Sequence, residues 1–321
     1  MKFRTEIAIK QWKNTIDHSH NILSLGSCFA DNISRHLAYY KFRVTASPTG
    51  ILFNPLSIAQ SIEAMHSNKR INAEELIESD GRYLHHDFHS SLSGATVEEA
   101  LESMNSALAL GAEALHNADY LIVTLGTAWA YRLRSSGKVV ANCHKQPSTN
   151  FERELLDIET NVEALERIAA RCSARIILTV SPVRHIGEGM EDNSLSKALL
   201  RVAIDKACRK SERFVYFPAY EIVIDDLRDY RFYGEDLVHP SAMAVEYVAE
   251  KFFATATSTL TRQLMESIAR IVRNAEHRPL HPDSEQYREL CRRTLVDISR
   301  LPQIDFSHEK DYFKRMLQIN L

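Results

Sequence analysis

The sequence predicts an α/β fold, a layered α/β/α arrangement in which helices cover both faces of a parallel sheet. Short apolar runs of strand length recur between residues 21 and 217, and a helical pattern separates each run from the next. Beyond about residue 262 only helical patterns remain. Strands that are apolar almost throughout are typical of a parallel sheet covered on both faces. At 321 residues and 45% hydrophobic content, the chain is long enough to bury such a core.

The elements follow one another in a regular order. A strand at 21–25 precedes a helix at 28–40, in which apolar residues recur at helical spacing. Three more helix and strand pairs are predicted at 101–116 and 119–126, at 161–172 and 175–180, and at 194–211 and 213–217. Another helix is expected after His239, as far as Phe253, with Pro240 in its first turn.

Two regions are expected, an α/β domain over residues 1–262 and a helical C-terminal extension over 263–321. Pro279, Pro282 and Pro302 should break the extension into separate helices. These helices would pack on the domain or on a second subunit, so a homodimer through them is one expectation.

Composition argues against several classes of partner. The formal net charge of −3 gives no basic surface for nucleic acid or an anionic membrane. The N-terminal residues lack the apolar core of a signal peptide, and no apolar run approaches the roughly 18 residues of a membrane helix. The five cysteines form no C-x-x-C pair. We expect a cytoplasmic protein with free thiols.

Two short motifs supply a hydroxyl, a carboxylate and an imidazole. Ser27 lies in Gly-Ser-Cys-Phe-Ala directly after the first strand, and Asp236 and His239 lie in Asp-Leu-Val-His-Pro-Ser. A serine becomes a good nucleophile when a base removes its proton and a carboxylate orients that base. The alternative is structural, because Ser27 and His239 could each simply cap the helix that follows.

Strand ends should bring distant motifs together. Ser27, Gly126 with Thr127, and Ser181 with Pro182 all come just after predicted strands. Parallel sheets bind ligands outside the carboxyl ends of their strands. We therefore expect one site along the carboxyl ends of the strands, which we call the rim. Arg184 and His185 would be further substrate contacts there, unless their loop is merely solvated.

Other clusters admit other chemistry. His85, His86 and His89 could bind a metal if their segment were helical, but the Ser- and Gly-rich surroundings favour a loop that contacts substrate or only solvent. Cys143 and His144 are poorly placed as a dyad, since adjacent residues of an extended chain point to opposite sides. No metal and no cofactor is required.

Six segments resemble the GSCFA family, which is placed near the SGNH (GDSL-like) hydrolases. They are residues 24–30, 124–131, 140–147, 179–185, 216–221 and 228–241. The resemblance implies a flavodoxin-like three-layer α/β/α fold, with Ser27 as nucleophile and Asp236 and His239 as its partners. It also favours contact with substrate for the loop that holds His89.

The resemblance to SGNH enzymes fails at one position. Those enzymes carry Gly-x-Asn-Asp after a central strand, where this chain has Gly-Thr-Ala-Trp from Gly126. The asparagine of the oxyanion hole is therefore missing. The candidate replacements are Thr127, the amide of Gly50 and Asn142, with Gly126 as a neighbour in the site. The amides of Ser27 and Cys28 would also hold the oxyanion.

The sequence thus predicts a serine hydrolase that cleaves a small acyl ester, such as an acetyl group on a carbohydrate or another polar carrier. Two alternatives remain open. An acyltransferase could use the same triad, and a non-catalytic protein that binds carbohydrate or acyl groups could retain the fold.

Overall fold

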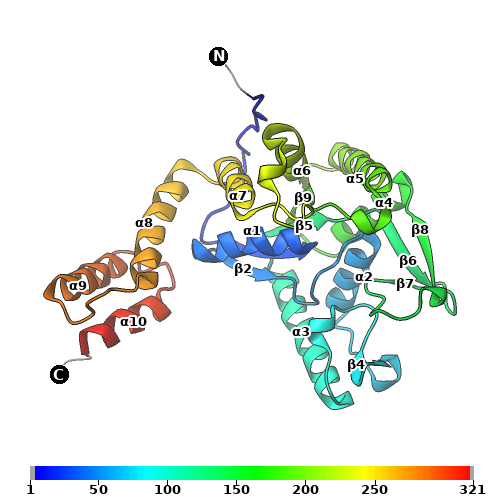
Figure 1. The fold of residues 1–321 in the computed structure, drawn as a ribbon, viewed down its shortest axis with the longest axis horizontal. Helices are drawn as coiled ribbons and strands as arrows, with labels where there is room; N and C mark the ends of the chain where they lie inside the picture. The colour runs from blue at the N-terminus through cyan, green and yellow to red at the C-terminus, as the bar shows by residue number, and fades with distance from the viewer. Residues whose placement is uncertain (1–3, 319–321) are drawn as a thin grey trace.

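Five parallel strands form the central sheet in the computed structural model, which describes residues 4–318 except the side chain of Glu188 (Figure 1). The strands are β1 (Asn21–Gly26), β2 (Arg43–Ala46), β5 (Tyr120–Leu125), β9 (Arg175–Val180) and β10 (Phe214–Tyr216). They lie in the order β10-β9-β5-β1-β2, and every neighbouring pair is parallel. Counted along the chain, this is the flavodoxin-like order 2-1-3-4-5.

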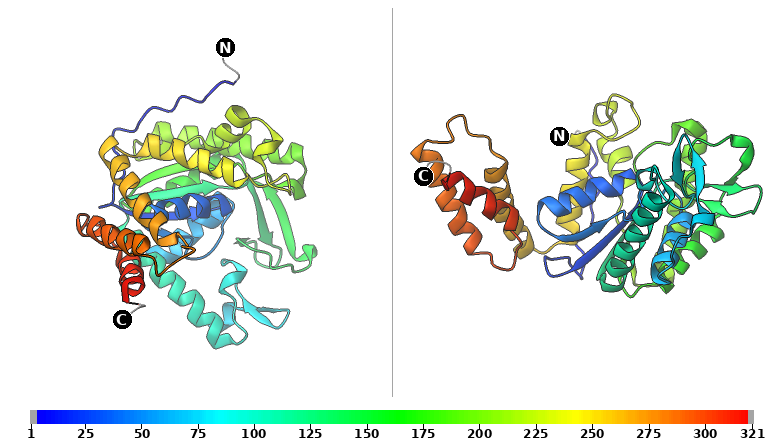
Figure 2. Two further views of the ribbon diagram at one scale, coloured as in Figure 1. Left: turned by 60° about the vertical axis from the view of Figure 1, so that its left-hand side comes forward. Right: turned by 90° about the horizontal axis from the view of Figure 1, so that it is seen from below.

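Helices cover both faces of this sheet, so the predicted three-layer fold is confirmed. One face packs against α2 (Pro55–His66), α3 (Val97–Asn117), α4 (Ile158–Ala170) and α5 (Met190–Lys210). The other packs against α1 (Cys28–Tyr39) and α7 (Ala242–Ala256), as Figure 2 shows. Successive residues of a strand point to opposite faces, so Leu23 joins the first core and Ile22 the second.

Small elements that the sequence pattern did not predict surround the sheet. An antiparallel hairpin pairs β3 (Ile77–Ser79) with β4 (Arg82–Leu84), and a second antiparallel sheet contains β6 (Trp129–Leu133), β7 (Val139–Val140) and β8 (Phe151–Leu155). Short 3₁₀ helices cover Ala73–Glu75, Ser90–Leu92, Ser148–Asn150, Ile186–Glu188 and Tyr230–Phe232. The short helix α6 (Ala219–Glu221) continues into a π-helix over Ile222–Leu227.

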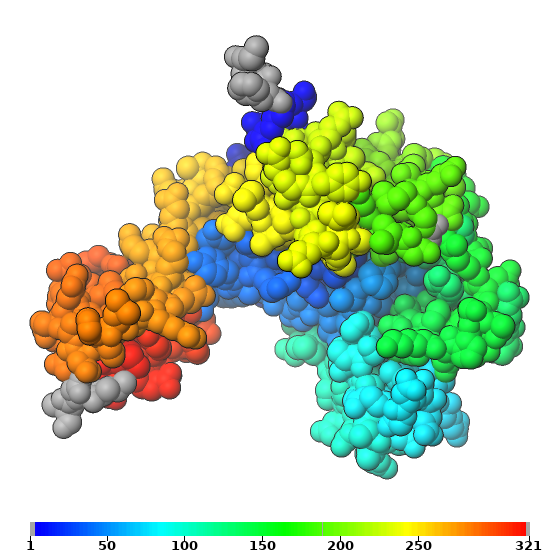
Figure 3. All heavy atoms as spheres, viewed as in Figure 1, coloured from blue at the N-terminus to red at the C-terminus, as the bar shows by residue number. Residues whose placement is uncertain are grey.

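Three helices form the C-terminal region, α8 (Thr259–Glu276), α9 (Glu285–Ser299) and α10 (Ser307–Gln318). Pro279, Pro282 and Pro302, which were predicted to break the extension, lie between these helices. The region has its own apolar core and projects to one side of the sheet (Figure 2). Figure 3 shows a wide notch between it and the part of the molecule that holds α3. Across residues 4–318, no helix is both long enough and apolar enough to cross a bilayer.

The domain boundary expected at 262/263 falls inside α8. Met265 packs into the core beneath α1 and α7, whereas Ile268 and Ile271, less than two turns later, belong to the C-terminal core. One continuous helix therefore contributes to both apolar cores.

Candidate active site

The predicted rim lies where the order of the strands reverses. β1 and β5 are neighbours, but the chain proceeds from β1 outward to β2 and returns to β5 on the other side. Ligands of flavodoxin-like sheets bind at this switch point, outside the carboxyl ends of the strands. Ser27 directly follows β1, and Gly126 directly follows β5. Ser27 and Gly126 thus lie at the position where such folds bind ligands, as their place after predicted strands indicated.

A strained turn presents Ser27. Gly26 has φ +133°, and a Cβ at this position would lie 2.1 Å from the carbonyl oxygen of Thr124. Ser27 is the N-cap of α1, where its Oγ accepts a hydrogen bond from the Phe29 amide at 3.4 Å. The structural role considered for Ser27 is therefore real. Only 1% of the residue is exposed, so its hydroxyl faces the interior of the turn.

Asp236 and His239 form the expected carboxylate–imidazole pair. His239 Nδ1 lies 2.7 Å from Asp236 Oδ2, and the amides of Val238 and His239 donate to Asp236 Oδ1 at 2.9 and 3.0 Å. Leu237, with φ +57°, lets the loop fold back for these bonds. The amide bonds, together with the His239 ring, lower the pKa of Asp236 to about 2. An ionised Asp236 selects the tautomer with the proton on Nδ1 and leaves Nε2 able to accept a proton.

The two halves of the predicted triad differ in burial, and among residues 4–318 no hydrogen bond joins Ser27 Oγ to His239. The His239 side chain is 54% exposed, whereas Ser27 is buried. His239 does not cap α7, because that helix begins at Ala242 with Ser241 as its N-cap; Pro240 precedes the cap instead of lying in the first turn.

Most predicted oxyanion donors are already engaged. The Ser27 amide donates to Thr124 O at 3.0 Å, and the Gly50 amide donates to Ser47 O at 2.8 Å. The amides of Gly126 and Thr127 both donate to Phe53 O, at 2.7 and 3.1 Å. The amides of Ser27 and Gly50, which were predicted to hold the oxyanion, are therefore not free to do so. Cys28 is different, since its amide is the first of α1 and has no acceptor within the helix.

The side chains proposed to replace the missing asparagine also point elsewhere. Thr127 Oγ1 lies 3.0 Å from the buried Ser196 Oγ, and Asn142 Oδ1 accepts from the His144 amide at 2.9 Å. The backbone of Asn142 pairs with His86, since its amide donates to His86 O at 3.0 Å and its carbonyl oxygen lies 2.9 Å from His86 Nδ1. Ala128, which stands where the SGNH resemblance predicts an asparagine, is wholly buried.

His89 and Gly50 lie together beside the start of α1. The His89 amide donates to Thr49 O at 3.1 Å, and a Cβ on Gly50 would lie 2.2 Å from His89 Cβ. Both line a hollow of about 560 Å³ whose other wall includes Asp31, one turn along α1 from Ser27. The predicted contact residues His89 and Gly50 thus border a cavity large enough for a small carrier.

His185 lies on the opposite side of the rim. Its ring packs against the edge of Phe53 at 5.4 Å, and its Nε2 faces Gly126. Its amide donates to Asn193 Oδ1 at 3.0 Å, while the neighbouring Arg184 amide donates to Val238 O at 3.2 Å in the loop of His239. Burial, with the charges of Lys197 and His239, lowers the pKa of His185 to about 4. The ring is therefore neutral at physiological pH.

Lys197 is a site neighbour that the sequence did not reveal. It lies within α5, only 2% exposed, and its Nζ donates to the carbonyl oxygens of Gly126 and Ser181 at 2.5 and 2.8 Å. In the sequence it occupies one polar position of a helical pattern, and no periodicity distinguishes it from solvated lysines.

The cysteines near the site are not activated. Burial raises the pKa of the Cys28 thiol, and Asp31 adds to this rise. Burial also raises the pKa of Cys143 to about 11. The His144 ring uses Nε2 to contact His85 O at 2.9 Å. A thiolate nucleophile is disfavoured at both positions.

His85 and His86, which could bind a metal together with His89 if their segment were helical, lie in a loop. His85 packs against Phe88, and His86 against His144 and Phe151. Within the described part of the chain, no three His, Cys, Asp or Glu side chains gather as metal ligands.

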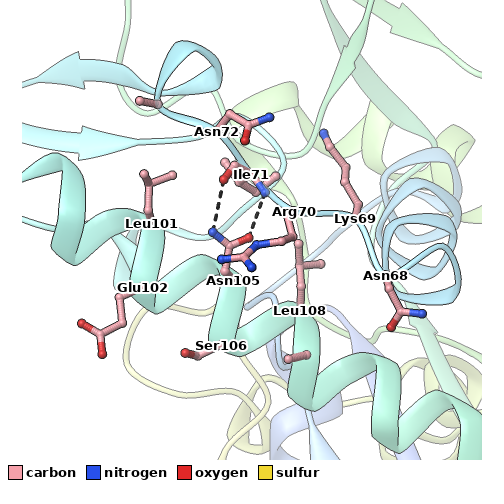
Figure 4. Close-up of a pocket in the computed structure, with 12 residues that line it drawn as sticks. Asn68, Lys69, Arg70, Ile71, Asn72, Leu101, Glu102, Asn105, Ser106 and Leu108 are labelled. Carbon is pink, nitrogen blue, oxygen red and sulfur yellow. Dashed lines mark hydrogen bonds between the residues drawn. The ribbon is translucent and has the colours of Figure 1, made fainter.

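A further hollow, of about 760 Å³, lies between residues 68–73 and α3 (Figure 4). Asn105 points into this region and pairs with the backbone of Ile71, accepting from its amide at 2.8 Å and donating to its carbonyl at 3.2 Å. None of the predicted site residues lines this hollow.

Comparison with protein families gives two matches that together cover most of the chain. Residues 21–252 match the GSCFA family, and residues 268–319 match the C-terminal domain of GSCFA domain proteins. No curated protein matches the chain. The first match includes the sheet, Ser27 and the Asp236–His239 pair, and the second covers most of α8, with α9 and α10. The chain belongs to the GSCFA family.

Proposed function

We propose that this protein is a serine-dependent ester hydrolase of the SGNH type, acting on a small acyl ester of a carbohydrate or another polar carrier. The observation that carries the proposal is the Asp236–His239 pair, whose geometry leaves His239 Nε2 able to accept a proton. The loop that holds this pair accepts a hydrogen bond from the Arg184 amide, at the same carboxyl end of the sheet where Ser27 follows β1.

The proposed reaction has two steps. Ser27 Oγ attacks the ester carbonyl carbon while His239 Nε2 takes the hydroxyl proton, which gives a tetrahedral oxyanion. The carrier leaves as an alcohol with that proton, and water then hydrolyses the acyl-serine with His239 again as the base. The Cys28 amide would donate to the oxyanion. The first step requires His239 Nε2 to come within hydrogen-bond reach of Ser27 Oγ.

A non-catalytic binding protein is the second candidate. The engaged amides of Ser27, Gly50, Gly126 and Thr127 favour it, because an oxyanion needs donors that are free. On this alternative, the hollow beside His89 would hold an acylated carrier without cleaving it.

Hydrolysis of p-nitrophenyl acetate separates the candidates. We expect Ser27→Ala to remove nearly all turnover and Cys28→Ala, the neighbouring control, to keep at least a tenth of it. Equal rates for wild type and Ser27→Ala on every ester tested would refute the hydrolase. An inactive Cys28→Ala beside an active Ser27→Ala would move the nucleophile to sulfur.

A further inference from the structure

Lys197 is the most unusual charged residue near the candidate site. Lysines are almost never fully buried, because removing an ammonium group from water is unfavourable. Lys197 is nevertheless 2% exposed, on the face of α5 that packs against the sheet. The hydrolase mechanism proposed above assigns it no role.

Its ammonium group joins the ends of two adjacent strands. Gly126 follows β5 and Ser181 follows β9, and the carbonyl oxygens of both residues accept from Lys197 Nζ. The strands are in register up to this point, with Leu125 opposite Val180, and the Ser181 amide donates to Leu125 O at 2.8 Å. Lys197 thus fixes the rim one strand away from Ser27.

The charge of Lys197 acts on both sides of the site. On one side, burial is the main cause that lowers the pKa of His185, and the charge of Lys197 is the next. On the other side, burial and Asp31 raise the pKa of Cys28, while Lys197 opposes that rise. Cys28 adjoins Ser27, so the positive potential extends to the residue predicted to be the nucleophile.

We propose that Lys197 is a positioning residue of this site: it holds the carboxyl ends of β5 and β9 together and supplies a buried positive charge that favours negative charge on the bound acyl oxygen. This role rests on the proposed hydrolase function. Ala128 offers no side-chain donor, and the Gly126 and Thr127 amides are engaged, so electrostatic stabilisation must come from elsewhere.

Two substitutions separate the charge from the hydrogen bonds. Lys197→Gln keeps a donor near the two carbonyl groups but removes the charge, whereas Lys197→Met removes both. Lys210→Met is the matched control, since Lys210 lies on the same helix and pairs with Glu166 at 2.6 Å, outside the site. Each full-length variant is assayed on p-nitrophenyl acetate, its thermal unfolding is recorded, and the His185 ring is titrated by NMR.

We expect Lys197→Gln and Lys197→Met to lower kcat about tenfold or more, with KM changed by less than about twofold. In both variants the pKa of His185 should rise from about 4 toward 6.5 without reaching it, because burial remains the larger cause. Lys210→Met should leave kcat, KM and the pKa of His185 unchanged.

A folded Lys197→Gln variant with wild-type kcat would overturn the proposal. Lys197 would then only hold the ends of β5 and β9 together. An unchanged His185 titration in both variants would overturn it equally. If wild type shows no turnover that depends on Ser27, the hydrolase function itself fails. The His185 titration then decides alone whether the charge of Lys197 acts in this site.

Discussion

Asp236 is the most firmly held member of the candidate triad, because three hydrogen bonds converge on its carboxylate. With a pKa of about 2, the group stays ionised through the whole physiological range. A permanently charged Asp236 can hold the His239 proton on Nδ1 and stabilise the imidazolium that forms during catalysis.

Asp236→Asn should therefore preserve the fold but reduce kcat by about 10³-fold or more, since an amide can favour the wrong imidazole tautomer. The measurement is kcat on p-nitrophenyl acetate, with thermal unfolding as the check on folding. A folded Asp236→Asn variant that retains more than about a third of wild-type kcat would show that Asp236 only shapes the loop.

His185 should make the protein less stable in mild acid. Its pKa is about 4 in the folded protein against 6.5 ordinarily, so the unfolded chain binds a proton more readily between these values. Stability should then fall as the pH drops from about 6.5 to 4, by at most about 3 kcal/mol. His185→Gln should lose less stability than wild type over this interval in urea titrations. Parallel pH profiles for the two proteins would contradict this.

The residues of the site were only partly predictable from sequence. Ser27, Asp236 and His239 stand in short motifs, and the Asp236–His239 bond follows from a three-residue offset. Other features of the site come from bonds between distant segments: the Gly126 amide donates to Phe53 O, and the buried Lys197 donates to Ser181 O. Such bonds between distant segments leave no periodic trace in the chain.

At the scale of elements, the turn from β1 to α1 is the critical connection. Gly26 combines φ +133° with a close approach to Thr124, so a side chain there meets both a strained backbone and a clash. Gly26→Ala should cost about 2–4 kcal/mol of unfolding free energy, or prevent folding.

Gly187→Ala is the matched control for this turn, because a Cβ at Gly187 would meet no atom within 4 Å. It should change stability by less than about 0.5 kcal/mol in the same urea titration. Comparable losses in the two variants would show that the turn from β1 to α1 is not specially constrained.

The predicted elements were confirmed where they are long or wholly apolar. β9 has the predicted bounds, and β1 and β5 differ by a residue or two, since both are buried along nearly all their length. β2 was missed because Arg43–Ala46 is a short edge strand with no buried residue. β6 and β8 were missed because they pair with each other outside the main sheet, with part of their length exposed.

At the scale of the whole molecule, a buried ion pair connects the C-terminal helices to the sheet domain. Lys41 Nζ, just after α1, lies 2.6 Å from Glu309 Oε1 on α10, and the Glu309 side chain is 6% exposed. Lys41 also lies over the Phe306 ring at 5.8 Å. The far end of the helix that begins beside Ser27 thus rests on the C-terminal region.

Glu309→Gln should lower the unfolding free energy by about 1–3 kcal/mol, less than for a fully buried pair, because Lys41 is partly exposed. Glu285→Gln, which breaks the exposed pair with Arg292, should cost much less, because exposed ion pairs contribute little to stability. Urea unfolding of both variants tests the difference. Equal losses would mean that the Lys41–Glu309 contact does not anchor the C-terminal helices.

The homodimer expected through the C-terminal helices stays a prediction, which light scattering of the full chain can test.

Labelling of the full-length chain with a fluorophosphonate probe tests the central claim most directly, because such probes react with an activated serine. Mass spectrometry of the digested adduct should place the label on Ser27, and Ser27→Ala should abolish it. His239→Ala should slow the labelling strongly, since the base would be gone. No adduct on Ser27, under conditions in which a known serine hydrolase reacts fully, would contradict the account, as would an adduct that persists in Ser27→Ala.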